Sequence, residues 1–136
     1  MNSYDFVVIG AGPAGGAAAL SASESGVSTL IVERRTEVGK PIQCGEFVPS
    51  LEELQVLLSG CEHVGLVADA AKRTKTNEIE NIVLVSPKKR RYEIPFQGLV
   101  VDREKLDKGF VRRAVKLGAE LLSLIHISEP TRPLYI

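Results

Sequence analysis

The sequence predicts an α/β fold with a parallel sheet, and three observations near the N-terminus support this prediction. The apolar run Phe6 to Ile9 is followed directly by the turn Gly-Ala-Gly-Pro-Ala-Gly at residues 10–15. An alanine-rich segment then has the composition of a helix, and Gly26 stands where a helix commonly ends. A second apolar run, residues 28–32, ends at Glu33. Strand, glycine turn, helix and strand in this order predict the βαβ unit of a Rossmann-like sheet.

Each glycine of the turn is expected to have its own task. Gly10 permits the tight turn, Gly12 lets the backbone approach a pyrophosphate, and Gly15 lets the helix pack closely on the strand. The unpaired N–H groups at the helix N-terminus favour the pyrophosphate further, and Pro13 suits the first helical turn because it lacks an N–H. Glu33 follows the glycines by about 20 residues, where an acidic side chain accepts hydrogen bonds from a ribose diol. The sequence therefore predicts a dinucleotide site.

Two further helices are indicated by their capping residues. Ser50, with Glu53 three residues on, forms a capping box for a helix over residues 50–58. Asp102 can cap a helix over residues 103–117, and this helix places four apolar side chains on one face: Leu106, Phe110, Ala114 and Leu117. Residues 61–75 follow no recognisable pattern. We therefore expect two more helices and one unassigned stretch.

The remaining strands are expected around a hairpin. Residues 79–85 and 90–95 flank the turn Ser-Pro-Lys-Lys at 86–89, which predicts a β-hairpin. Residues 99–101 resemble another strand, and a last strand begins at residues 119–121. Residues 34–48 read as a long connection. We expect the hairpin to be inserted between two βα pieces of the nucleotide-binding sheet.

Composition excludes several classes of partner. Seventeen basic residues balance 17 acidic ones, so no overall field attracts nucleic acid or a membrane. Aromatic residues make up 5% with no Trp, which argues against a base-stacking surface. No apolar run has the length of a membrane span, and Asp5 interrupts any leader peptide. Two cysteines form no disulfide framework and fit a reducing compartment, so a cytoplasmic location and no metal site are expected.

The C-terminal residues look foreign to the rest of the chain. Residues 122–132 match, in one reading frame, the translation of a transposase-type sequencing-library adapter. We therefore expect the natural sequence to end near Leu121, residues 122–136 to be a non-native tail, and the parent protein to be longer. A genuine edge strand at residues 124–127 is the alternative. On the first interpretation His126 has no catalytic meaning.

Three motifs together resemble a known family. The first motif consists of residues 4–15 together with Glu33-Arg34-Arg35. The second is Val-Gly-Lys-Pro-Ile-Gln-Cys-Gly-Glu at residues 38–46. The third is Val-Asp-Arg at residues 101–103 together with Leu-Asp at 106–107. The chain resembles the flavoprotein monooxygenase-type fold, and within it the geranylgeranyl reductase family of FAD-dependent oxidoreductases. The first motif is shared by many FAD enzymes, whereas the second is the narrower signal.

The resemblance implies a role for each motif residue. Gly12, Pro13, Ala14 and Gly15 would place backbone on the FAD pyrophosphate, Glu33 would hold the adenosine ribose and Arg34 would lie along the adenine. Cys44, Gly45 and Glu46 would lie near the isoalloxazine ring, and Arg103 would pair with the phosphates or ribityl hydroxyls. Structural alternatives stay open: solvated charges at Arg34 and Arg35, a first-turn helix residue at Arg103, and an inert thiol at Cys44. The basic run at residues 88–91 is either a solvated hairpin tip or a contact for anionic lipid headgroups.

The family resemblance also implies an activity. FAD would supply a hydride to a carbon–carbon double bond of a geranylgeranyl group, carried by a prenylated lipid or a chlorophyll precursor, and NAD(P)H or ferredoxin would be the electron donor. Residues 1–121 would form an incomplete N-terminal FAD-binding domain, with the substrate domain beginning near residues 79–100. The family's second flavin motif, a Gly-Asp, is absent, so no catalytic acid can be named. Aromatic hydroxylation or halogenation, a nicotinamide enzyme without flavin, and a non-catalytic dinucleotide-binding fragment remain as alternatives.

Overall fold

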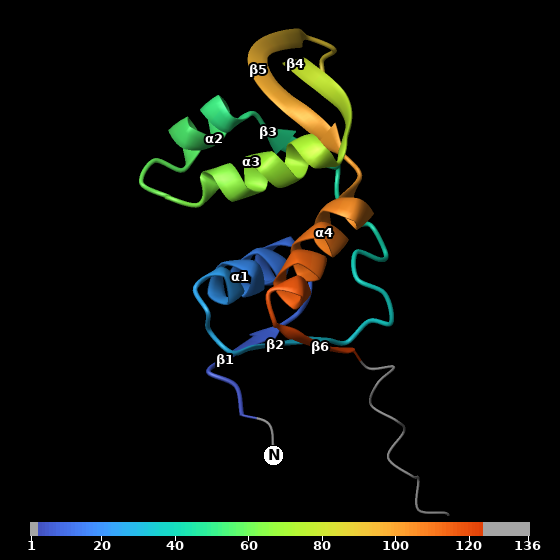
Figure 1. The fold of residues 1–136 in the computed structure, drawn as a ribbon. Helices are drawn as coiled ribbons and strands as arrows, with labels where there is room; N and C mark the ends of the chain where they lie inside the picture. Colours follow the sequence, from blue (N-terminus) through green and yellow to red (C-terminus); the bar gives the residue numbers. More distant parts are fainter. Residues whose placement is uncertain (1–2, 124–136) are drawn as a thin grey trace, which may run out of the picture. The chain divides into compact units, whose positions relative to one another are not determined.

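The computed structural model describes residues 3–123. The chain divides into two compact units: Met1–Pro41 with Asp107–Ile136, and Ile42–Leu106. Each unit has its own three-stranded sheet, so the second unit is an insertion in the sequence of the first (Figure 1).

The first unit is a parallel sheet with helices on one face. Its strands are β1 (Phe6–Ile9), β2 (Thr29–Glu33) and β6 (Glu120–Ser123), in the order β1-β2-β6. Helix α1 (Pro13–Glu24) connects β1 with β2, and the larger part of α4 (Arg103–Lys116) lies beside α1 (Figure 1). The core contains six apolar side chains at most 2% exposed: Ala11, Ala19, Leu20, Ile31, Phe110 and Ala114. The predicted βαβ unit is confirmed.

The two helices of this unit approach each other through a glycine. A Cβ added at Gly16 would lie 2.9 Å from the Cβ of Phe110, a distance that real side chains do not tolerate. Gly26 (φ 75°) and Gly118 (φ 104°) adopt left-handed backbone just beyond the C-termini of α1 and α4, as helix ends favour. Close packing of α1 on α4 therefore depends on the absence of a side chain at Gly16.

The second unit is an antiparallel sheet with two helices. Its strands are β3 (Phe47–Pro49), β4 (Lys75–Val85) and β5 (Arg91–Val101), in the order β3-β5-β4. Helices α2 (Leu51–Leu57) and α3 (Val64–Arg73) enclose a small apolar core whose buried residues are Leu54, Val64 and Ala68. The β4–β5 hairpin extends away from these helices within the unit (Figure 1). The predicted hairpin is confirmed, and its strands are longer than expected.

The predicted caps are confirmed, with the expected donors. The Ser50 hydroxyl accepts a hydrogen bond of 3.3 Å from the Glu53 N–H at the start of α2. The Asp102 carboxylate accepts one of 3.0 Å from the Lys105 N–H at the start of α4. Each cap satisfies one of the N–H groups that a helix leaves unpaired.

Other expectations about the elements are wrong. Residues 99–101 are no separate strand, because β5 runs without interruption from Arg91 to Val101. The place of the hairpin is not among these errors: it lies in the unit inserted between β2 and β6, as expected, and forms the second sheet with β3 as its third strand. The stretch over residues 61–75 contains helix α3, and the expected connection over 34–48 contains the start of β3. Leu117 is 52% exposed, because α4 ends one residue before it.

The predicted tail lies mostly outside the described residues. Leu122 and Ser123 complete β6, where they pair with Val32 and Glu33 of β2. The alternative strand at residues 124–127 and His126 lie outside the part of the chain that the structure describes.

Candidate functional site

The glycine turn joins the C-terminal end of β1 to helix α1. Gly10 has φ 101°, which only glycine adopts without strain, and its N–H donates to the Val32 carbonyl at 2.7 Å. A Cβ added at Gly15 would lie 1.9 Å from the carbonyl oxygen of Gly10 and 3.1 Å from Val8. Helix and strand are thus too close for any side chain at Gly15, as the sequence predicted.

Gly12 contrasts with Gly15 because it faces open space. A Cβ there would meet no heavy atom within 4 Å. Gly12 is the N-cap of α1, no side chain caps this helix end, and Pro13 occupies the first helical turn. Pro13 and Ala14 are exposed. Backbone N–H groups, a helix dipole and free space together fit an anionic group such as a pyrophosphate.

Glu33 ends β2 beside this turn, because β1 and β2 are parallel with Ile9 opposite Val32. Its side chain is buried, and both carboxylate oxygens accept hydrogen bonds. The Ala11 N–H donates to Oε2 at 2.6 Å, and the Arg35 N–H donates to Oε1 at 2.9 Å. Each carboxylate oxygen can accept a second hydrogen bond, which is what a ribose diol requires. Glu33 is therefore oriented by the backbone at the position that the dinucleotide motif predicts.

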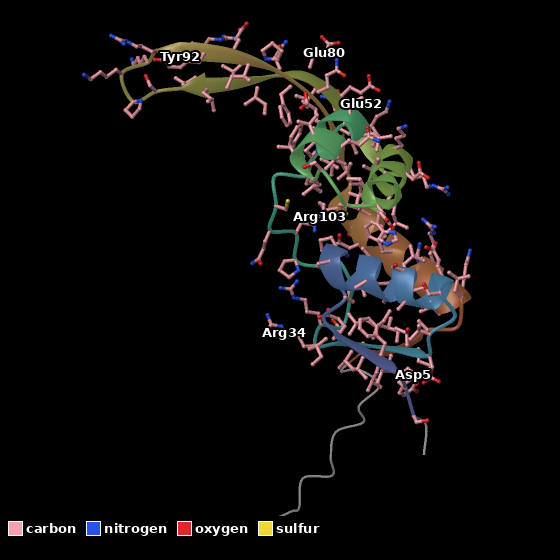
Figure 2. The ribbon with its side chains drawn as sticks, turned by 90° about the vertical axis from the view of Figure 1, so that its left-hand side faces the viewer. Asp5, Arg34, Glu52, Glu80, Tyr92 and Arg103 are labelled. Atoms are coloured by element: carbon pink, nitrogen blue, oxygen red, sulfur yellow. The ribbon has the colours of Figure 1, made fainter. Side chains whose placement is uncertain are left out.

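The segment after Glu33 carries charged side chains. Arg34 is exposed, and Figure 2 shows it at the edge of the first unit. Glu37 binds Lys108 of α4 at 2.5 Å and Lys40 at 3.1 Å. The hydrogen bond from Lys108, followed by that from Lys40, holds the pKa of the Glu37 carboxyl below its usual range. This ion-pair network links the segment after β2 to α4.

The second unit holds the other predicted residues. Cys44 and Gly45 are exposed. Glu46 has left-handed backbone (φ 60°), a conformation that costs a non-glycine residue about 1 kcal/mol. Its carbonyl accepts a hydrogen bond of 2.8 Å from the Val101 N–H, and its carboxylate oxygen Oε1 lies 3.5 Å from the Arg103 N–H. The structure thus brings Glu46 and Arg103 together, although 57 positions separate them in the sequence.

The predicted residues therefore form two groups. Gly10 to Gly15, Glu33 and Arg34 lie in the first unit, whereas Cys44, Gly45, Glu46 and Arg103 lie in the second. The sequence did not indicate the backbone donor Ala11, the close approach at Gly16 or the pairing of Glu37 with Lys108. A second glycine directly after Gly15 was a usable signal for close helix packing. The other two contacts depend on tertiary structure, which no local pattern reveals.

Residues 3–123 contain neither a candidate metal site nor a helix suited to span a membrane. No cluster of three or more His, Cys, Asp and Glu side chains that could hold a metal ion occurs in this part of the chain. Within the same residues, no helix has both the length and the apolar character needed to cross a bilayer.

Comparison with known proteins agrees with the geometry. Residues 5–39 match the FAD dependent oxidoreductase family, a range that contains the glycine turn and Glu33. The chain is 38% identical over 123 residues to digeranylgeranylglycerophospholipid reductase 2 of Methanopyrus kandleri, covering 90% of this chain and 28% of that protein. The match thus concerns an N-terminal part of the relative.

Solved structures give the same result. A geranylgeranyl bacteriochlorophyll reductase-like protein from Thermoplasma acidophilum superposes with a TM-score of 0.68 at 28% identity, covering 88% of this chain and 30% of that one. A flavin-dependent brominase superposes with a TM-score of 0.60 at 26% identity, covering 87% and 28%. The α/β flavoprotein fold expected from the sequence is confirmed. The chain spans less than a third of the length of each of these three proteins.

Sequence and fold thus lead to one family, and the resemblance drawn from the three motifs is confirmed. Over most of its length the chain is similar to an N-terminal part of geranylgeranyl reductases, and the FAD dependent oxidoreductase match over residues 5–39 supports FAD as the cofactor.

Proposed function

We propose that the protein containing this chain reduces carbon–carbon double bonds of a geranylgeranyl group, and that this chain supplies the adenosine and pyrophosphate part of its FAD site. One observation supports the FAD site most strongly. Buried Glu33 is oriented by the Ala11 N–H at 2.6 Å, directly beside a helix N-terminus that faces open space at Gly12. This arrangement offers a ribose acceptor and a pyrophosphate cradle within a single βαβ unit.

The roles that we propose for the single residues are those that the family resemblance implies. The backbone of Gly10, Gly12, Pro13, Ala14 and Gly15 would lie against the pyrophosphate. Glu33 would accept hydrogen bonds from the adenosine ribose, and Arg34 would lie along the adenine. In the second unit, Cys44, Gly45 and Glu46 would lie near the flavin ring, while Arg103 would bind its phosphate or ribityl side. Bound FAD supplies the hydride chemistry, and the protein supplies binding and orientation.

The substrate class that we propose is taken from the names of the similar proteins. The Methanopyrus protein is named for reduction of a digeranylgeranylglycerophospholipid, and an isoprenoid lipid is the substrate we propose here. An electron donor is needed to reload the flavin, with NAD(P)H or ferredoxin as candidates. We further propose a cytoplasmic location, and peripheral contact with a membrane would give the protein access to a lipid substrate.

The test uses the complete protein loaded with FAD. It is given digeranylgeranylglyceryl phospholipid and a chemical reductant, and the lipid is analysed by mass spectrometry. We expect each saturated double bond to add the mass of two hydrogen atoms. A protein that binds FAD but changes no isoprenoid would contradict the substrate, whereas a protein that binds no FAD would contradict the site.

The brominase similarity favours one second candidate, halogenation or hydroxylation of an aromatic ring on the same fold. The same preparation is therefore incubated with a phenol, oxygen and bromide, together with NADH and a flavin reductase as the source of reducing electrons. A brominated or hydroxylated product, in the absence of lipid reduction, would replace the reductase proposal.

A further inference from the structure

The far end of the β4–β5 hairpin exposes apolar side chains on one face. Leu84 pairs with Tyr92, and Ile82 pairs with Ile94. Because residues two apart in a strand share a face, these four side chains lie together. Leu84, Tyr92 and Ile94 are 51%, 53% and 42% exposed. Figure 2 shows Tyr92 near the far end of the hairpin.

The turn that follows this face is well ordered by hydrogen bonds. The Ser86 N–H donates to the Arg90 carbonyl at 2.8 Å, and the Lys89 N–H donates to the Ser86 carbonyl at 2.8 Å. The Ser86 hydroxyl also accepts from the Arg90 N–H at 3.0 Å. These hydrogen bonds define the backbone of the turn, from which the side chains of residues 88–90 extend beside the apolar face.

Those side chains carry an uncompensated positive charge. Arg91 pairs with Glu93 at 2.6 Å. Lys88, Lys89 and Arg90 are exposed, and within residues 3–123 none of them forms an ion pair. Four basic residues and one acidic residue over 86–93 give a net charge of +3. In a chain whose overall charge is zero, this concentration is local to the hairpin.

We propose that this hairpin end, residues 82–94, docks the protein on an anionic lipid surface. An apolar face alone would suit many partners, but three unpaired cations beside it select a partner with negative charge. A bilayer with anionic lipids offers both parts at the right places: headgroups for the cations and the acyl boundary for Leu84, Tyr92 and Ile94. Nucleic acid would satisfy the cations only, since its phosphates offer nothing to the aliphatic side chains. The inference requires neither bound FAD nor reductase activity.

The test measures vesicle binding by the complete protein. Flotation with phosphatidylcholine vesicles is compared with flotation on vesicles that also contain phosphatidylglycerol, at low and at physiological salt. We expect binding only to the anionic vesicles. Replacement of three cations (Lys88→Gln, Lys89→Gln and Arg90→Gln) should weaken it by roughly a hundredfold at low salt, since each cation near such a surface contributes about a fivefold factor. A second variant, Leu84→Ser with Tyr92→Ser, should lose the part of the binding that salt does not screen.

A charge-matched variant serves as the control. Arg73→Gln, Arg112→Gln and Lys116→Gln also remove three exposed cations, but none from the hairpin. Its vesicle binding should change less than threefold. Thermal unfolding of each variant checks that the fold is retained. Equal losses in the two triple variants, no binding to anionic vesicles, or equal binding to an RNA oligonucleotide at the same salt would each overturn the proposal. The proposal would also be overturned if the rest of the protein buries the hairpin end. In that case residues 82–94 would be protected from chemical labelling even in the absence of vesicles.

Discussion

The main-chain N–H of Ala11 donates a 2.6 Å hydrogen bond to the buried carboxylate of Glu33, so the glycine turn and the end of β2 are held together directly. A second backbone donor, the Arg35 N–H, occupies the other carboxylate oxygen. This pair of contacts orients Glu33 without any ligand. Residues 10–15 and Glu33 are therefore already arranged for binding before any nucleotide is present.

Glu33→Gln is expected to weaken both the fold and nucleotide binding. The amide can offer an oxygen to only one of the two backbone N–H donors, which leaves the other unsatisfied at a buried position. The expected cost is about 1–3 kcal/mol of unfolding free energy, measured by urea denaturation of the complete protein. Affinity for FAD, measured by flavin fluorescence, should fall by at least tenfold. Glu24→Gln, an exposed change on the same unit, is the control and should leave both quantities nearly unchanged.

Replacement by alanine is expected to have different effects at Gly12 and at Gly15 of the turn. In Gly15→Ala the new methyl group would lie 1.9 Å from the Gly10 carbonyl, so the fold is expected to lose about 3 kcal/mol or more. Gly12→Ala meets no atom within 4 Å and should cost less than about 1 kcal/mol, but its methyl group would stand where we place the pyrophosphate. Equal FAD affinity in wild type and Gly12→Ala would contradict that placement.

The two cysteines provide an internal comparison for the second motif. Both thiols are exposed in the structure. If Cys44 lies near the flavin as proposed, saturating FAD should slow its alkylation by iodoacetamide at least tenfold while Cys61 reacts at an unchanged rate. Peptide mass spectrometry distinguishes the two sites. Equal protection of both thiols would indicate a general ordering of the chain, and protection of neither would remove Cys44 from the site.

The Glu37 ion pairs should make stability depend on pH in the acid range. Because Lys108 and Lys40 hold the pKa of the Glu37 carboxyl below its unfolded value, their contribution is complete at neutral pH. It is lost as the pH falls below about 4.3, the ordinary value for Glu, and through the lowered pKa. Wild type should therefore be more stable than Lys108→Met at pH 7, and the difference should shrink as the solution is acidified. Urea midpoints across this range measure it, and a difference independent of pH would refute the electrostatic origin.

Local signals were sufficient for the elements with distinct ends. The βαβ unit was predicted because its glycines mark both ends of α1, and α2 and α4 were predicted because Ser50 and Asp102 are caps with real donors. Helix α3 was missed because its N-cap is His63, which makes no side-chain cap, and because Gly65 lies in its first turn. The usual start signal is therefore missing from this helix.

The extent of strand β5 could not be predicted from its own sequence. The sequence predicted a break after Pro95 in what is one continuous strand, β5. Pro95 is tolerated because it pairs with Asn81 next to a register shift, and Gly98 is required because a Cβ there would lie 2.4 Å from the Phe47 ring. Both reasons lie in the partner strands. The same limit applies to the candidate site, since the contact of Glu46 with Arg103 joins two motifs that the sequence presented separately.

The insertion of the second unit between neighbouring strands affects how the first sheet is assembled. Strand β2 ends at Glu33 and its partner β6 begins at Glu120, so residues 34–119 separate them, which is 86 residues. At a synthesis rate of about 5–20 residues per second, roughly 4–17 s pass between the synthesis of β2 and that of β6. Until β6 is made, β1, α1 and β2 can form only a two-stranded layer in which one edge of β2 is unpaired. An unpaired edge can pair with a strand of another chain, so aggregation is the hazard during this interval. Among the strands of residues 3–123, the pairing of β6 with β2 is therefore the last contact of this sheet that becomes possible during synthesis.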